Sequence, residues 1–204
     1  MLTLRLRPQP DGGIGGPDGG SLSMMGPLCS NWLWVCASST KRNESNGNLG
    51  DPSLEKVAYG NEMNKRVSFW IIFAKHLGIS WLLEQTQNSC FCKTADMQTA
   101  LGATGAKKIS FDMFAFGHCA VKPTQLWGTV YWLPELASLA KESNYVERQV
   151  RTPVPLTTRY YKDGAIKVDG KPDALSQSQA YPPKFCLEVL KLHFPNKFAE
   201  GGKC

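Results

Sequence analysis

One pattern constrains the fold more than any other: an apolar stripe at helical spacing that runs directly into an apolar strand pattern. Apolar side chains recur every three or four residues from Met63 to Leu77 and stop at Gly78, which predicts a helix that opens near Asp51. Ile79 to Leu83 follows at once as a candidate for a buried strand. Helix followed by strand is the unit of α/β proteins, so we expect a sheet covered by helices.

Weaker patterns on either side extend this plan. Residues 22–25 predict a short strand before the long helix. After it come a helix over 95–101, a strand over 107–113, a strand over 125–129, a helix over 133–141, an Asp-Gly hairpin over 159–168 and a final helix between Pro182 and Pro195. We therefore predict an α/β fold: an incomplete, mostly parallel, three-layer Rossmann-like sheet with an irregular C-terminal part that contains the hairpin and the final helix.

The predicted organisation is a single domain over residues 22–194. Residues 1–21 are rich in glycine and proline and are expected to form a flexible tail, and residues 195–204 a C-terminal tail. A chain of 204 residues is long enough to bury one substantial core. The sheet is expected to be truncated at its N-terminal side, because only 21 residues precede the first predicted strand.

Composition favours an intracellular, soluble protein. The chain is 42% hydrophobic and 20% charged, which is ordinary for a globular domain. Its longest apolar run, Phe69 to Leu83, is interrupted by Lys75 and His76 and is too short to cross a membrane. Seven cysteines are an odd number and are scattered, so they indicate free thiols in a reducing compartment. A net charge of +6 is compatible with a polyanionic partner, but solvated lysines and arginines spread along the chain are the favoured explanation.

The chemistry most clearly indicated lies where two predicted strands end. The strand over 22–25 leads into a turn that presents Cys29 and Ser30, and the strand over 79–83 is followed directly by Glu84. The carboxyl ends of parallel strands meet at one edge of a sheet, so a thiol and a carboxylate can face one cavity there. The simpler interpretations are a small buried cysteine and a carboxylate paired with a basic residue.

The order of these residues resembles the catalytic core of C5-cytosine DNA methyltransferases. The shared features are a strand, Gly-Pro-x-Cys-Ser, a polar loop, a long helix, a strand and a glutamate. A closer resemblance is to uncharacterised proteins that look like divergent relatives of that family. It extends from Leu22 to about Leu192 through Cys-Ser-x-Trp-x-Trp-Val, Thr-Lys-Arg, Leu-Gly-Asp, Trp-Leu-Leu-Glu-Gln, Phe-Gly, Lys-Pro-Thr-x-Leu-Trp-Gly and Ala-Tyr-Pro-Pro.

The resemblance implies roles for particular residues. Cys29 would be the thiolate that attacks a pyrimidine ring, and Glu84 the acid that protonates or hydrogen-bonds the ring nitrogen of a base flipped out of its stack. The expected nucleic-acid contacts are Ser30, Lys41, Arg42 and Lys122. S-adenosylmethionine would be the methyl donor only if the donor-binding part exists upstream, since the strand, glycine loop and acidic residue that would hold it are missing before Leu22.

The sequence also departs from the family pattern. Leu28 precedes Cys29 where the family has proline, and Gln85 follows Glu84 where the family has asparagine. The segment that begins at Lys122 occupies the place of the family's paired-arginine motif. No metal is predicted, because the spacing of Cys90, Cys92, His118 and Cys119 does not suit a zinc site. Three hypotheses follow: a methyltransferase-like domain that is inactive by itself, a noncatalytic nucleic-acid-binding or protein-interaction module, and a truncated gene product without independent function. The oligomeric state is left open.

Overall fold

The computed structural model describes residues 2–4, 20–170 and 179–199. Its strands are β1 (Leu2–Leu4), β2 (Leu22–Met25), β3 (Ser80–Thr86), β4 (Lys107–Asp112), β5 (Pro123–Gly128), β6 (Thr157–Lys162) and β7 (Ala165–Gly170). Its α-helices are α1 (Ala37–Thr40), α2 (Glu55–His76), α3 (Ala95–Thr104), α4 (Leu133–Val150), α6 (Pro183–His193) and α7 (Pro195–Ala199). Short 3₁₀ turns are η1 (Trp34–Cys36), η2 (Glu44–Asn46), η3 (Phe91–Lys93) and η4 (Met113–Phe116).

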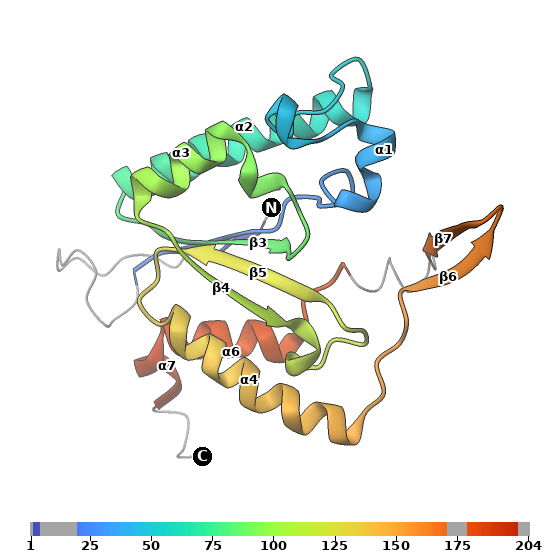
Figure 1. The fold of residues 1–204 in the computed structure, drawn as a ribbon. Helices are drawn as coiled ribbons and strands as arrows, with labels where there is room; N and C mark the ends of the chain where they lie inside the picture. Colours follow the sequence, from blue (N-terminus) through green and yellow to red (C-terminus); the bar gives the residue numbers. More distant parts are fainter. Residues whose placement is uncertain (1, 5–19, 171–178, 200–204) are drawn as a thin grey trace.

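The α/β class is confirmed, with helices on both faces of a central sheet (Figure 1). Successive side chains of β3 point to opposite faces, as a pleated strand requires. Trp81 and Leu83 pack in a cluster with α2 and α3, whereas Leu82 packs in a second cluster with α4 and α6. The near-continuous apolar run of β3 therefore reflects burial on both sides, and the molecule has three layers.

The prediction of a mostly parallel sheet is wrong. The strand order is β1-β2-β3-β5-β4, and only the β2–β3 pair is parallel. Strands β2, β3 and β4 do run in one direction, since α2 and α3 return the chain between them, but β5 lies reversed between β3 and β4. The physical reason is the connection: residues 113–122 join β4 to β5 without a full crossover helix, so the chain turns back on itself and pairs antiparallel.

Other boundaries also differ from the sequence prediction. The long helix begins at Glu55 rather than near Asp51, because the Asp51 carboxylate binds the backbone N–H and hydroxyl of Ser53 in a turn. Helix α4 continues to Val150, past the predicted end at Lys141.

The two predicted tails contain regular structure. Of the predicted tail 1–21, residues 2–4 form β1, and residues 5–19 lie outside the described residues. Pro195–Ala199 forms α7 in the predicted tail 195–204. None of the described helices has the length and apolar character needed to span a bilayer.

Candidate functional site

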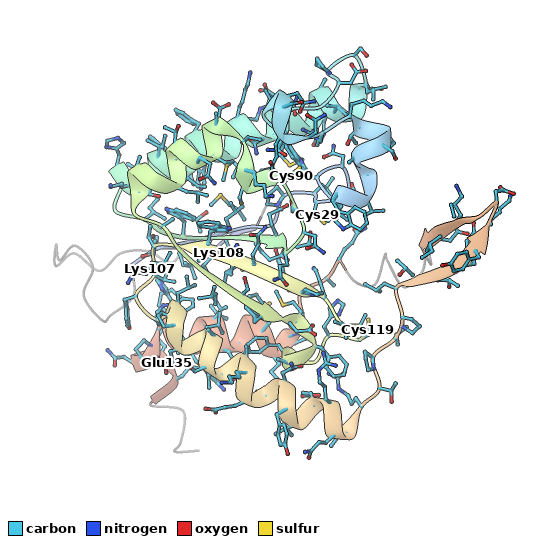
Figure 2. The ribbon with its side chains drawn as sticks, in the orientation of Figure 1. Cys29, Cys90, Lys107, Lys108, Cys119 and Glu135 are labelled. Carbon is cyan, nitrogen blue, oxygen red and sulfur yellow. The ribbon has the colours of Figure 1, made fainter. Side chains whose placement is uncertain are left out.

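The turn that carries Cys29 is held against the end of β3. Met25 at the end of β2 lies opposite Leu83, so the carboxyl ends of these two parallel strands share one edge of the sheet. The Gln85 side-chain amide donates a hydrogen bond of 2.8 Å to the carbonyl of Pro27, and the Trp32 N–H closes the turn on the Cys29 carbonyl at 2.9 Å. The structure thus brings Cys29 close to Glu84 at this edge, where Figure 2 labels the cysteine.

Glu84 is buried on the opposite face of β3 from Gln85 and has two polar neighbours. Its Oε1 lies 3.7 Å from Nζ of Lys122, and its Oε2 accepts a hydrogen bond of 3.2 Å from the Tyr181 hydroxyl. Burial raises the pKa of Glu84, because a carboxylate loses hydration there; Lys122, Tyr181 and His118 oppose that rise. The carboxyl group is therefore held closer to protonation than an exposed glutamate.

Cys29 is half-buried and is a thiol rather than a thiolate near neutral pH. Burial raises its pKa first, and the negative charge of Glu84 adds to the rise. Lys122 lowers the pKa, and Thr86 is placed to donate a hydrogen bond to a thiolate. Because the thiolate is the nucleophilic form, Cys29 is not activated in this arrangement.

Two buried oxygen atoms at this site have no hydrogen-bond partner among the described residues: Oε1 of Glu84 and Oγ1 of Thr86. Glu84 and Thr86 are two apart on β3, so their side chains leave the strand on the same face. Buried polar atoms in folded proteins are nearly always hydrogen-bonded. Oε1 of Glu84, whose ion pair with Lys122 is longer than a hydrogen bond, and Oγ1 of Thr86, near the Cys29 thiol, therefore retain capacity to bind a polar ligand on this face of β3.

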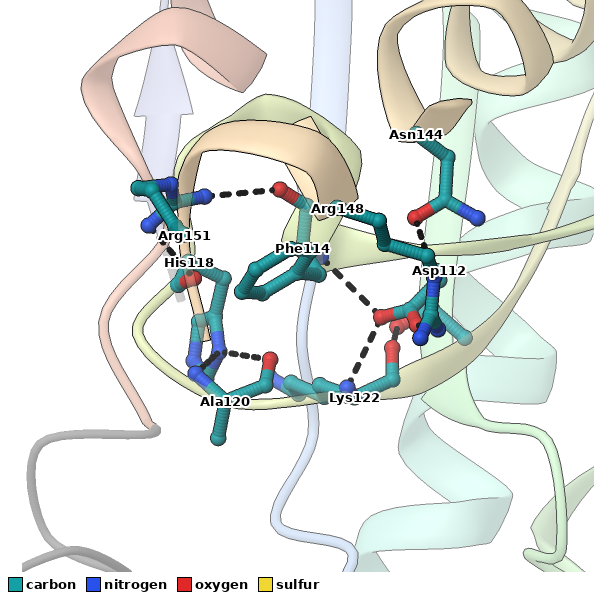
Figure 3. A network of polar contacts seen from close by, with 9 residues as sticks. Asp112, Phe114, His118, Ala120, Lys122, Asn144, Arg148 and Arg151 are labelled. Atoms are coloured by element: carbon teal, nitrogen blue, oxygen red, sulfur yellow. Dashed lines mark hydrogen bonds and ion pairs between the residues drawn. The ribbon is translucent and has the colours of Figure 1, made fainter. Parts of the chain in front are cut away.

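A polar network fixes the loop that delivers Lys122 to Glu84 (Figure 3). Oδ1 of Asp112 accepts hydrogen bonds from the backbone N–H groups of Phe114 (3.0 Å) and Lys122 (2.9 Å), and its Oδ2 pairs with Arg148 at 3.2 Å. Arg151 donates to the carbonyls of Phe114 and His118 at 3.0 and 3.3 Å. Both ends of the loop are thereby attached to α4, which positions Lys122.

Tyr181, like Thr86, is a site residue that the sequence analysis did not single out. It lies just before α6, and besides its bond to Glu84 its ring is 5.7 Å from Nζ of Lys122. A Cβ atom at Gly26 would overlap the Tyr181 hydroxyl, so this tyrosine packs directly on the turn that leads to Cys29. The only sequence signal was the Ala-Tyr-Pro-Pro motif, whose tyrosine occupies the position next to the helix start.

Of the four predicted nucleic-acid contacts, Lys122 pairs with Glu84, two others are exposed and one is buried. Ser30 is exposed next to Cys29, and Lys41 is exposed at the end of α1. Arg42 is buried: its guanidinium lies 3.5 Å from the centre of the Trp32 ring and donates to the carbonyls of Asn31 and Asn48. The prediction for Arg42 is therefore corrected, because its donors are occupied inside the protein.

The described residues form no binding site for a methyl donor beside β2. The neighbour of β2 there is β1, which runs antiparallel, so its carboxyl end lies at the opposite edge from Cys29. A donor site at the carboxyl ends of adjacent parallel strands does not fit that direction. Nowhere in the described ranges do three His, Cys, Asp or Glu side chains gather as a metal site.

Comparisons with protein-family models, with curated proteins and with solved structures found no match to this chain.

Proposed function

We propose that this chain is a methyltransferase-like α/β domain that binds an unstacked pyrimidine base of a nucleic acid at the Cys29–Glu84 site and does not transfer a methyl group by itself. The observation that carries the proposal is a pair of buried oxygen atoms without a hydrogen-bond partner among the described residues, Oγ1 of Thr86 and Oε1 of Glu84, the latter with only a 3.7 Å ion pair to Lys122. The edge of a pyrimidine offers adjacent hydrogen-bond donors and acceptors, and these two atoms are an acceptor next to a hydroxyl that can donate or accept.

The charges around the site support the same conclusion. A glutamate with a raised pKa can remain protonated and donate to a ring nitrogen, and Lys122 lies beside it to balance the charge when it is ionised. Tyr181 binds Oε2, and Oε1 has only the 3.7 Å ion pair with Lys122, so a base at Oε1 would share this oxygen with the Lys122 ammonium group. The base would have to leave its stack to reach this buried edge, which costs least in single-stranded nucleic acid.

The raised pKa of Cys29 favours binding without catalysis over nucleophilic attack. A nucleophilic cysteine normally has a lowered pKa, supplied by a nearby cation or a helix N-terminus. Here burial and Glu84 act in the opposite direction, and Lys122 offsets only part of their effect. The second candidate function is covalent addition of Cys29 to the pyrimidine ring. It therefore requires a change at the site that removes the negative charge of Glu84.

The test measures binding of a single-stranded oligonucleotide that carries one cytosine, against the same strand with an abasic position there. We expect the protein to bind the cytosine strand more tightly than the abasic strand. Glu84→Ala is expected to reduce the ratio of the two affinities roughly tenfold, since it deletes a buried hydrogen-bond partner. Glu62→Gln is the matched control, because Glu62 is an exposed carboxylate on α2. Equal affinity of the unmodified protein for both strands would overturn the proposal.

A further inference from the structure

We propose that His193 is a pH-sensitive latch, which holds the end of α6 against the starts of β2 and α4 and releases it in mild acid. His193 is the last residue of α6 and is 4% exposed. Its Nε2 lies 2.9 Å from the carbonyl oxygen of Gly20, just before β2. Its Nδ1 lies 3.3 Å from the indole nitrogen of Trp132, the residue before α4. One imidazole ring therefore joins three segments that are far apart in the chain.

The two contacts fix the protonation state of this ring. The indole nitrogen of Trp132 can only donate a hydrogen bond, so Nδ1 of His193 accepts it with a lone pair. A carbonyl oxygen can only accept, so Nε2 carries the hydrogen that it donates to Gly20. Only the neutral ring with its hydrogen on Nε2 satisfies both contacts. Protonation of Nδ1 would make two N–H groups face each other across the 3.3 Å contact.

The surroundings of the ring do not compensate a positive charge. The aromatic rings of Trp132 and Phe194 pack against it edge-on, with centroids 6.1 and 4.6 Å from its own. Burial lowers the pKa of His193, because the imidazolium ion loses hydration there, and the bond to the Gly20 carbonyl opposes this effect. Among the described residues, no charged side chain contributes to the lowering or opposes it.

The charged groups on the elements packed around His193 are engaged elsewhere or exposed. On α6, Lys191 and Glu188 pair with each other at 3.0 Å. On α7, Nζ of Lys197 lies 5.4 Å from the centre of the Phe194 ring, and a cation there does not favour a second positive charge nearby. Glu135, in the first turn of α4, is exposed to solvent. Titration of His193 is therefore governed by its two hydrogen bonds and its burial.

Release of the latch affects one end of α6 before the other. Phe185 and Val189 anchor the first part of this helix in the core shared with α4, on one face of the sheet (Figure 1). The last turn lies beyond these anchors, and there the Phe194 N–H donates to the Leu190 carbonyl at 2.9 Å. Loss of the His193 contacts would therefore free this turn and α7 first. The inference goes beyond the proposed function and does not depend on base binding at Glu84.

The direction of the pH effect follows from proton linkage. The closed latch requires a neutral ring, whereas His193 in the open form titrates near the ordinary pKa of 6.5. The stabilising contribution is therefore complete above pH 6.5 and is lost as the pH falls from there through the lower pKa of the closed form. Within that window one proton is taken up on opening, so the opening constant rises by up to about tenfold for each pH unit.

Hydrogen exchange of the full chain at about pH 5 and about pH 7.5 measures this opening, after correction for the intrinsic exchange rate. The Phe194 amide is expected to lose protection at least about fivefold at the lower pH, while amides of β3 change less than about twofold. His193→Gln does not titrate and should remove this difference between the two pH values. His76→Gln is the matched control, since His76 is exposed on α2, and it should retain the difference.

A second measurement concerns the ring itself. In the unmodified protein at about pH 7.5, nitrogen-15 NMR should show the hydrogen of His193 on Nε2 and none on Nδ1. Trp132→Phe removes the donor that requires an unprotonated Nδ1, so the pKa of His193 should rise toward 6.5. The latch is overturned by the opposite tautomer, by an unchanged pKa in Trp132→Phe, or by acid-dependent exchange at Phe194 that persists in His193→Gln. Equal loss of protection in β3 would also overturn it, because the opening would then be global unfolding.

Discussion

The hydroxyl of Tyr181 donates a hydrogen bond of 3.2 Å to the carboxylate of Glu84, and so joins the segment before the last long helix to the middle of the sheet. The two residues are 97 positions apart; Glu84 is buried and Tyr181 is partly buried. The same hydroxyl lies against Gly26 in the turn that leads to Cys29. One side chain thus fixes the relative positions of the carboxylate and the thiol.

This contact predicts that Gly26→Ala destabilises the protein through Tyr181. The added methyl group would overlap the Tyr181 hydroxyl, and overpacking of this kind costs about 1–3 kcal/mol. Tyr181→Phe removes the hydroxyl and leaves the ring carbons at 3.3 and 3.7 Å from the new Cβ, so the double variant is expected to lose less than the sum of the two single variants. Urea denaturation of the four proteins measures this coupling.

Gly102→Ala serves as the control for the Gly26 experiment. No atom lies within 4 Å of a Cβ built at Gly102, which lies inside α3, so alanine there is expected to stabilise the protein by about 0.5–1 kcal/mol. Strict additivity of Gly26→Ala and Tyr181→Phe would show that the tyrosine does not pack on the turn as described.

The raised pKa of Glu84 predicts how stability depends on pH. The folded protein holds the Glu84 proton more tightly than the unfolded chain, so this stabilising contribution is complete below the ordinary pKa of 4.5 and is lost as the pH rises through the folded value. Glutamine imitates the protonated acid and does not titrate. Glu84→Gln should therefore gain stability relative to the unmodified protein over that window, by about 1.4 kcal/mol for each unit of pKa elevation.

The measurement for Glu84 is the free energy of unfolding of both proteins at several pH values. The gap between them should widen from acid toward neutral pH and then stay constant, because Lys122, Tyr181 and His118 reduce the shift without reversing it. A gap that narrows as the pH rises would mean that the ion pair with Lys122 outweighs the loss of hydration.

The same charges predict the reactivity of Cys29. Glu84→Gln removes the negative charge that raises the thiol pKa, so alkylation of Cys29 should become several times faster at about pH 8.5, near the ordinary thiol pKa. Lys122→Met removes the opposing cation and should slow it. Site-resolved mass spectrometry follows Cys186 as the internal control, since burial alone raises its pKa and no charged side chain contributes. Parallel changes at both cysteines would contradict an electrostatic cause.

Local patterns were sufficient to predict α2, β3 and the turn at Cys29, because each depends on periodicity or on turn residues close together in the chain. The direction of β5 was not predictable in this way. It depends on whether residues 113–122 form a crossover helix, and the polar network around Asp112 folds them back as a loop instead. Pairing direction is a tertiary property that hydrophobic periodicity does not encode.

The candidate site was predictable only in part for a similar reason. Cys29 and Glu84 each follow an apolar strand, so strand direction alone brings them to one edge. Tyr181 reaches Glu84 from a distant segment, and no spacing rule connects the two. Arg42 was misassigned because a basic residue in a polar loop is usually solvated. Here the ring of Trp32, ten positions earlier in the chain, covers its guanidinium, and no local pattern predicts that contact.

Arg42 and Lys41 provide a final prediction, since two adjacent basic residues have opposite environments. Arg42 is 5% exposed, lies over the Trp32 ring and donates to the carbonyls of Asn31 and Asn48 at 2.9 and 2.7 Å. Arg42→Lys cannot reproduce the flat, forked donor and should destabilise the protein by about 2–4 kcal/mol, whereas Lys41→Ala should change stability by less than about 0.5 kcal/mol. Thermal and urea denaturation measure both variants. If Arg42→Lys unfolds like the unmodified protein while weakening oligonucleotide binding, the guanidinium is a surface contact after all, and the structural role assigned to it is wrong.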